Sequence, residues 1–430
     1  CQGFFKMTAI GAIPEHWDLS EIKKLISLET GKRMKGGADV NGEVISVGGE
    51  HISEEGLLNL AKPKYISLDF YNELRQGKIH ANDVLLVKDG ATTGKLAYIS
   101  KMPKDKMAIN EHVFIIRGSI SALLDNQFLY YALKSSNGQK QIRFRYHGLI
   151  GGVTRGDIES IILPIPPIHE QRTISHVLRT IQNAREARLW EVALEKERKA
   201  ALMEHLFTHG TRGEATKQTE LGEMPESWKV VKLGEVFEVQ LGKMLSSKAR
   251  AGISPRPYLR NANVQWGKID LSDLYQMDFS DAEARKFELK YGDVLVCEGG
   301  EIGRTAIWHN EVEGCYYQKA LYRLRPKNNL IVPEYFLYYF MVAFIIRNTY
   351  GVSGTKTTIA HLPAIKLKML QIPIPNIEEQ KEISAVLGVC DSKIIALEHE
   401  ARLLEELFHA MLEELMSGRL PVGALVEEAA

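Results

Sequence analysis

The segment LPIPPIHEQRTI at residues 163–174 decides the fold, because a similar segment, QIPIPNIEEQKEI, returns at residues 371–383. In both copies the prolines hold the chain extended, since proline fixes its backbone angle and lacks the amide hydrogen that a helix uses. A long charged stretch with regularly spaced apolar residues follows each copy. The sequence therefore predicts the same unit twice, an extended entry followed by a long helix.

The repeat extends outward over nearly the whole chain with a period near 210 residues. GAIPEHW at 11–17 returns as GEMPESW at 222–228, NDVLLVKDGATTGK at 82–95 as GDVLVCEGGEIGR at 292–304, and FLYY at 128–131 at 336–339. Short runs rich in Val and Leu and bounded by glycine predict strands, and the FLYY segments predict amphipathic helices with aromatic core faces. Each repeat should form a mixed α/β lobe.

We therefore predict an α+β fold with two similar lobes, two long helices and a pseudo-two-fold internal repeat. The expected boundaries are 1–167 for the first lobe, 168–210 for the first helix, 211–375 for the second lobe, 376–418 for the second helix and 419–430 for a C-terminal tail.

The two long helices are predicted to pair as an antiparallel coiled coil. The second has a clear seam, with apolar steps of three and four residues: Leu387, Cys390, Ile394, Leu397, Ala401, Leu404, Phe408, Met411 and Leu415. The first is less regular, with Leu178, Ile181, Leu189, Ala193, Lys196, Ala200, Met203 and Phe207. Because the first is slightly basic and the second acidic, pairing with each other is favoured over packing of each helix on its own lobe.

The start of each helix carries polar residues with two interpretations. Asn376 is placed to cap the second helix, with Glu379 at the capping-box position. Glu379 and Gln380, with their counterparts Glu170 and Gln171, either initiate the helix and pack it on the lobe or form a docking corner for a partner.

Net charge is zero, with 54 basic and 54 acidic residues, but the charges are unevenly distributed. Residues 1–160 carry +3, residues 214–370 carry +3 and residues 371–430 carry −8. An acidic C-terminal segment thus masks two mildly basic lobes. The four cysteines form no CxxC pair, and no run of 18 apolar residues exists, so free thiols and a cytoplasmic location are expected.

The two lobes are similar, but their sequences diverge most at residues 33–80 and 244–290. This pattern favours recognition of two different short DNA sequences, here called words, separated by a gap of base pairs that are not recognised. The chain resembles the specificity subunit of a Type I restriction-modification enzyme over nearly its full length. The resemblance is carried by LPIPPIHEQRTISHVL and IPIPNIEEQKEISAVL, the paired glycine-rich segments, the PEHW and PESW openings and GTKTTIAHLPAIKLKMLQIPIP at 354–375.

This resemblance implies that each lobe is a target recognition domain for double-stranded DNA and that the helices form a spacer. It also implies that two modification (methyltransferase) subunits dock on the chain and that restriction (motor and nuclease) subunits join them. S-adenosylmethionine, ATP and Mg²⁺ would then belong to those partners, with no cofactor or metal in this chain.

The residues agree that the chain is not an enzyme. It lacks the Asn/Asp-Pro-Pro-aromatic motif of a DNA adenine methyltransferase, and no GxGxxG, Walker or HExxH pattern occurs. Two alternatives remain: a nuclease or methyltransferase in its own right, and a scaffold that bridges only proteins.

Candidate DNA-contacting residues lie in expected loops, where Lys and Arg suit phosphate or guanine and Asn suits adenine. In the first lobe they are Lys32, Arg33, Lys35, Arg143, Arg145 and Tyr146. In the second lobe they are Lys243, Lys248, Arg250, Arg260, Asn261, Lys356 and Thr357. The glycine-rich turns fail the P-loop spacing and are interpreted first as strand turns.

Overall fold

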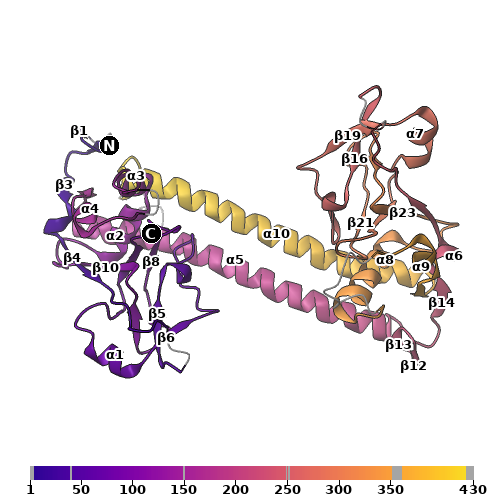
Figure 1. Cartoon of the computed structure of the whole chain (residues 1–430), viewed down its shortest axis with the longest axis horizontal. Helices are drawn as coiled ribbons and strands as arrows, with labels where there is room; N and C mark the ends of the chain where they lie inside the picture. The colour runs from indigo at the N-terminus through magenta and orange to yellow at the C-terminus, as the bar shows by residue number, and fades with distance from the viewer. Residues whose placement is uncertain are drawn as a thin grey trace. The chain divides into compact units, whose positions relative to one another are not determined.

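The chain folds into two compact units that each hold one lobe and parts of both long helices (Figure 1). The computed structural model describes residues 4–38, 41–148, 151–247, 249, 252–350 and 361–422. The first unit runs up to Arg188 and resumes at Glu400, and the second spans Leu189–His399. Both lobes combine helices with small sheets, which agrees with the predicted fold class.

Each lobe is built on a four-stranded antiparallel sheet with the same strand order. In the first unit the order is β4 (Ile26–Thr30), β10 (Val113–Gly118), β7 (Val84–Val87) and β8 (Leu96–Tyr98). In the second it is β15 (Phe237–Leu241), β23 (Leu321–Pro326), β20 (Val294–Cys297) and β21 (Thr305–Ile307). The predicted Val- and Leu-rich strands are thus confirmed as the centre of each lobe.

The central strands are apolar throughout because both of their faces are covered. In the first unit, Val84 and Leu86 of β7 pack in the cluster that contains helix α2 (Asn126–Lys134), whereas Leu85 and Val87 face a second, three-stranded sheet. That sheet consists of β6 (Lys64–Ile66), β5 (Val44–Val47) and β9 (Met107–Ile109). Its counterpart is β19 (Tyr275–Asp278), β16 (Pro255–Leu259) and β22 (Tyr316–Tyr317).

Shorter elements complete the lobes in matching positions. Two-stranded pairs are β1 (Phe5–Thr8) with β2 (Gly11–Pro14), β3 (Asp18–Glu21) with β11 (Ile162–Ile165), β12 (Thr216–Thr219) with β13 (Gly222–Pro225), β14 (Lys229–Lys232) with β24 (Gln371–Ile374), and β17 (Val264–Gln265) with β18 (Lys268–Ile269). Helices are α1 (Leu68–Glu73), α3 (Ser136–Phe144), α4 (Arg155–Glu159), α6 (Leu233–Val236), α7 (Asp281–Phe287), α8 (Pro333–Met341) and α9 (Ala364–Met369), with short turns η1 (Ile22–Lys24), η2 (Gly49–His51), η4 (Asn261–Asn263) and η5 (Val342–Ile346).

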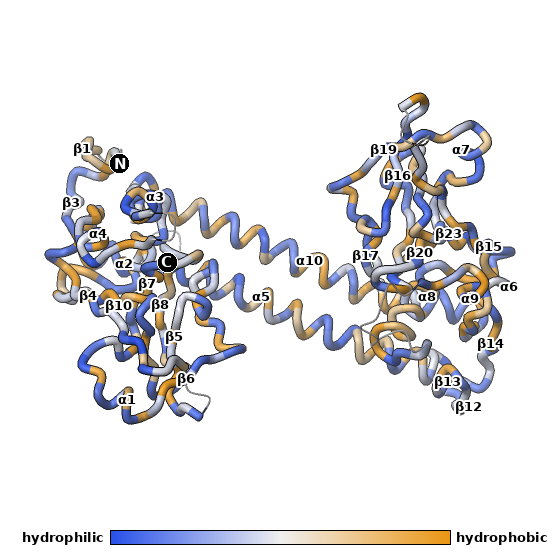
Figure 2. The backbone as a smooth tube through the Cα atoms, viewed as in Figure 1, coloured by the Kyte–Doolittle hydropathy of each residue, from blue (hydrophilic) through white to orange (hydrophobic). Residues whose placement is uncertain are grey.

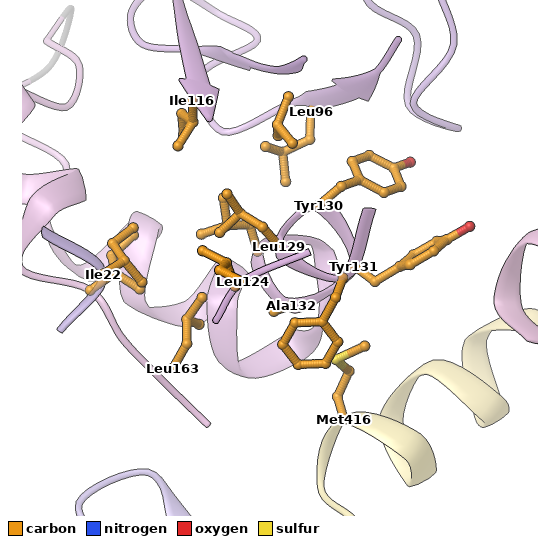
Figure 3. Close-up of a cluster of buried hydrophobic side chains, with 14 of the residues drawn as sticks. Ile22, Leu96, Ile116, Leu124, Leu129, Tyr130, Tyr131, Ala132, Leu163 and Met416 are labelled. Atoms are coloured by element: carbon orange, nitrogen blue, oxygen red, sulfur yellow. The ribbon is translucent and has the colours of Figure 1, made fainter. Parts of the chain in front are cut away.

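The aromatic helices α2 and α8 belong to the core, as their sequences predict. Tyr130 and Tyr131 of α2 are buried in the same cluster as Leu163 of β11 and Met416 (Figure 3). In the second unit Tyr335 and its neighbours on α8 fill the equivalent place. These rings therefore stabilise the lobes and are not available for stacking on bases.

A buried glutamine explains why the Pro-rich segment is repeated. Gln380 accepts a hydrogen bond from the Val332 amide at 2.8 Å and donates to the carbonyls of Leu330 and Pro375 at 3.1 Å each. Gln171 makes the same three bonds in the first unit, at 2.8–2.9 Å. Each glutamine thus joins the loop before the aromatic helix to the entry of the long helix.

The preceding glutamates anchor the tryptophans of the PEHW and PESW segments. Glu170 accepts a hydrogen bond from Trp17 Nε1 at 2.9 Å, and Glu379 accepts one from Trp228 Nε1 at 3.2 Å. Asn376 caps the second helix by accepting from the Glu379 amide at 3.0 Å. Of the two interpretations, these contacts support helix initiation and lobe packing.

The long helices α5 (Ile168–His209) and α10 (Ile377–Met416) lie side by side and antiparallel in both units (Figure 1). In the first unit Arg188 of α5 pairs with Glu400 of α10 at 2.7 Å; in the second, Lys199 pairs with Asp391 at 2.5 Å. The basic helix thus pairs with the acidic one, as predicted. The first lobe packs on the start of α5 and on the end of α10, where Phe408 lies in its core. The second lobe packs on the start of α10 and on the end of α5, where Phe207 lies in its core.

The predicted seam is correct for α10 and wrong for the middle of α5. Hydrophobic and hydrophilic residues alternate along both helices (Figure 2), and Leu387, Ile394 and Leu397 of α10 are buried as expected. The expected α5 positions Leu189, Ala193, Lys196 and Ala200 are instead exposed, and Val192 and Glu195 are buried. Here Val192 packs with Ile394 and Leu397 of α10, and Glu195 pairs with Lys393 at 3.0 Å, so the residues that face α10 differ from those expected.

Candidate nucleic-acid interface

The glycine-rich turns after β7 and β20 gather the segments that hold the predicted contact residues. In the first lobe the Val153 amide donates to the Lys88 carbonyl at 2.7 Å, which draws the segment after α3 onto the turn. In the second lobe the Leu362 amide donates to the Glu298 carbonyl at 2.8 Å and makes the equivalent connection. Gly90 and Gly300 have φ angles of 90° and 72°, which only glycine adopts readily.

A pocket of about 480 Å³ opens in the first lobe and is lined by His112, whose carbonyl accepts from the Lys88 amide at the start of the glycine-rich segment. Two predicted residues, Lys32 and Arg33, line it, and both are exposed. The Arg33 side chain is 75% exposed, with its Nε 3.6 Å from Glu111, so water weakens this ion pair. Lys35 is exposed but is not among the residues that line the pocket. Lys32 and Arg33 thus bring positive charge to a lining that also contains Glu50 and Glu111.

Of the remaining predicted residues of the first lobe, one forms hydrogen bonds within the lobe and two are exposed to solvent. Arg145 donates from Nε to Ser160 Oγ at 2.8 Å and from Nη2 to the Ser160 carbonyl at 3.1 Å, so it joins α3 to α4. Arg143 is exposed and donates to the Gln139 carbonyl one helical turn earlier, and Tyr146 is exposed. Arg143 and Tyr146 therefore remain open to a ligand.

In the second lobe, Lys243 is an internal residue. Its ammonium donates to the Asp278 carbonyl and to Glu283, both at 2.6 Å, and lies over the Phe279 ring. This hydrogen bond holds the pKa of Glu283 at about 2, well below its ordinary value. Lys243, whose side chain is 12% exposed, therefore fastens α7 to the sheet.

Arg260 and Asn261 lie in the turn that packs on the second glycine-rich segment. Arg260 stacks 3.7 Å from the Tyr275 ring centroid and pairs with Asp273, while Asn261 donates to the Gly299 carbonyl at 2.9 Å. Within the described part of the chain, Arg260 Nε and Asn261 Oδ1 are buried without a partner. The other predicted residues of this lobe, Lys248, Arg250, Lys356 and Thr357, lie outside the described residues.

Sequence reasoning missed several polar residues that the fold brings to the same surface. Lys64, Asn110 and His112 line the pocket with Lys32 and Arg33, although they come from β6 and from the turn after β9. No local motif marks them, because only strand pairing places them together. The signal available was their position at strand ends, where a sheet exposes side chains to partners.

Among the described residues, no group of three or more His, Cys, Asp or Glu side chains is arranged to hold a metal ion. None of the described helices is long and apolar enough to cross a membrane. Cys297 and Cys315 are buried free thiols, and burial raises the pKa of Cys297 to about 11, far from the range of a reactive thiolate.

The duplicated lobe, with the same strand order in both copies, defines a class of protein built from two copies of one domain. The family model for the Type I restriction modification DNA specificity domain matches the chain twice, over residues 14–193 and 225–407. The chain therefore belongs to this family and is a specificity subunit of a Type I restriction-modification system. Specificity subunits are non-catalytic recognition subunits.

Curated relatives match this chain over different lengths, one over nearly all of it and another over about two thirds. The Type I restriction enzyme MjaVIII specificity subunit of Methanocaldococcus jannaschii is 25% identical over 423 residues, which cover 96% of this chain and 95% of that protein. The EcoKI specificity subunit of Escherichia coli K12 is 23% identical over 315 residues, 66% of this chain and 62% of that protein.

Solved structures show the same fold. The S subunit of a Type I restriction-modification system from M. genitalium has a TM-score of 0.55 at 16% identity, covering 93% of this chain and 96% of that one. A second solved structure concerns complex assembly and conformational transition of the type I R-M system. Its matching chain has a TM-score of 0.59 at 18% identity, and the match covers 95% of this chain and 99% of that one.

Proposed function

We propose that the chain recognises a bipartite, asymmetric DNA target, with each lobe reading one half on double-stranded DNA. The observation that carries this proposal is the duplicated surface. In both lobes the same backbone elements, a glycine-rich turn and the short turn η2 or η4, meet at a surface with different side chains. Recognition of two different DNA sequences requires different hydrogen-bonding side chains, which a shared backbone can present in the two lobes.

We further propose that α5 and α10 set the unread gap and dock two modification (methyltransferase) subunits. Helices of 42 and 40 residues are long enough to act as a spacer. Some apolar side chains of α5 and α10 are exposed to solvent, among them Trp190 and Val389, each 67% exposed. Exposed apolar side chains of this kind support docking of a partner on the helices. Restriction subunits would join this assembly in the cytoplasm, and S-adenosylmethionine, ATP and Mg²⁺ would be bound by the partners.

The alternatives make different predictions. A nuclease or methyltransferase in its own right would act on DNA without partner subunits when given Mg²⁺ or the methyl donor. A scaffold that bridges only proteins would show no DNA affinity that falls with salt. DNA recognition instead predicts an affinity that weakens steeply as salt rises, because bound cations are released from the phosphates.

Replacing Lys32 with alanine should weaken binding to all duplexes alike. Lys32 is exposed on the pocket surface, and a phosphate contact carries no sequence information. We expect the slope of log affinity against log salt to fall by about one, measured by fluorescence anisotropy on the assembled complex. Lys24→Ala, an equal loss of charge on the exposed η1 turn of the same lobe, is the control. An unchanged slope for Lys32→Ala would remove Lys32 from the interface.

A further inference from the structure

Two turns of three residues occupy equivalent positions in the lobes. One is Asn110–His112 between β9 and β10, and the other is Gln318–Ala320 between β22 and β23. The Asn110 amide donates to the Val47 carbonyl at 2.9 Å, as the Gln318 amide does to Leu259 at 3.0 Å.

The far end of each turn is also fixed in the same way. The His112 carbonyl accepts from the Lys88 amide at 2.9 Å, and the Ala320 carbonyl accepts from the Glu298 amide at 2.9 Å. Both donors begin the glycine-rich segments. Each turn is therefore held to the small sheet at one end and to the glycine-rich segment at the other.

A glycine clamps each turn from a third side. A Cβ added at Gly31 would collide with the carbonyl oxygen of Asn110, and a Cβ added at Gly242 would collide with that of Gln318. Only glycine allows the end of β4 or β15 to approach so closely. The backbone of the turn is therefore anchored at the same three places in both lobes.

The side chains on this backbone share a carboxamide at the first position and differ in kind at the second and third. Asn110 corresponds to Gln318, Glu111 to Lys319 and His112 to Ala320. All six residues are exposed or half-buried. Counted from the clamping glycines, Lys32 corresponds to Lys243 and Arg33 to Met244, so only the first lobe carries a charge at the second position after the glycine.

In the first lobe the turn also touches charged neighbours. Arg33 and His112 both approach Glu111, at 3.6 and 3.5 Å, and His112 Nδ1 lies 2.5 Å from Asp89. Asn110 Oδ1 accepts from the His112 amide at 2.9 Å, which orients its carboxamide. The ion pairs of Glu111 are long and largely exposed, so they can give way to a DNA contact.

Building on the proposed function, we propose that these two turns determine the sequence specificity of their lobes. A carboxamide at the first position presents one donor and one acceptor, which matches the major-groove edge of adenine. At the second position Glu111 accepts from the amino group of cytosine, whereas Lys319 donates to the acceptors of guanine. A rigid backbone lowers the entropy lost on binding, so these few side chains discriminate effectively.

The test transplants the turn of one lobe into the other. The variant N110Q/E111K/H112A gives the first lobe the side chains that the equivalently anchored turn carries in the second. The wild-type and variant chains are assembled with modification subunits, and bound sequences are selected from a randomised duplex pool. We expect the preference at one or more positions of one word to fall about 5- to 150-fold, with a shift from cytosine to guanine, while the other word is unchanged.

Controls separate this inference from the proposed function. E21K makes the same charge change on β3 of the same lobe and should leave both words intact. The reciprocal variant Q318N/K319E/A320H should alter only the other word. Unchanged words in both transplants, or equal loss of both words with intact thermal unfolding, would overturn the role of the turns. If the wild-type complex selects no bipartite sequence, the proposed function itself fails.

Discussion

Replacing Gln380 with leucine is expected to lower the free energy of unfolding of the second unit by at least about 3 kcal/mol. Gln380 is 1% exposed, and its carboxamide bonds three backbone groups of Val332, Leu330 and Pro375. Leucine has a similar volume but leaves these groups unpaired, and each unpaired buried group costs about 1–3 kcal/mol. Chemical denaturation followed by circular dichroism measures the change.

Two further variants make this expectation specific. Lys381→Ala removes the exposed neighbouring side chain, whose ion pair with Glu378 is exposed as well, and should change stability by about 0.5 kcal/mol or less. Gln171→Leu should destabilise the first unit as Gln380→Leu destabilises the second. A free energy of unfolding within about 1 kcal/mol of the wild type for either glutamine variant would show that the glutamine does not hold the long helix to its lobe.

Replacing Phe207 with alanine is expected to destabilise the second unit by about 3–5 kcal/mol, although Phe207 lies at the end of the helix that begins in the first lobe. Its ring is 1% exposed, with ring centroids 5.3 Å from Tyr335, 5.7 Å from Tyr339 and 6.3 Å from Trp228. Alanine would leave a cavity among these large rings. The same denaturation experiment on the full chain measures the loss.

Trp190→Ala provides the matched control on the same helix. Trp190 is larger than phenylalanine but is 67% exposed, so its removal should alter stability by no more than about 0.5 kcal/mol. A Phe207→Ala variant as stable as Trp190→Ala would show that the end of α5 does not pack in the core of the second lobe.

The repeat, the strands and the long helices could be predicted because their signals are local. The apolar runs at 84–87 and 294–297 are strands, and α5 and α10 begin at Ile168 and Ile377, where the Pro-rich segments end. The middle of α5 could not be predicted, because its register depends on contacts with residues about 200 positions later, apolar for Val192 and ionic for Lys199. Apolar periodicity carries no information about such partners.

The candidate interface was harder to predict for the same reason. Lys243 has the sequence context of a loop cation, but its partner Glu283 is 40 residues away and holds it inside the lobe. Asn110 has no motif of its own and reaches the pocket surface only because β9 pairs with β5. Residue type indicates which chemistry is available, whereas the pairing of distant strands decides where it is presented.

Methylation-site mapping tests the central claim most directly. The chain is co-expressed with its modification subunits in a host that lacks DNA methylation, and modified adenines are located by sequencing the genome. If each lobe recognises DNA, the modified sites should share one bipartite motif, with two short defined sequences separated by a gap of fixed length. Replacement of one lobe by that of another family member should then change only one of the two sequences. A soluble complex that modifies no defined sequence, or a single uninterrupted word, would contradict recognition by two separate lobes.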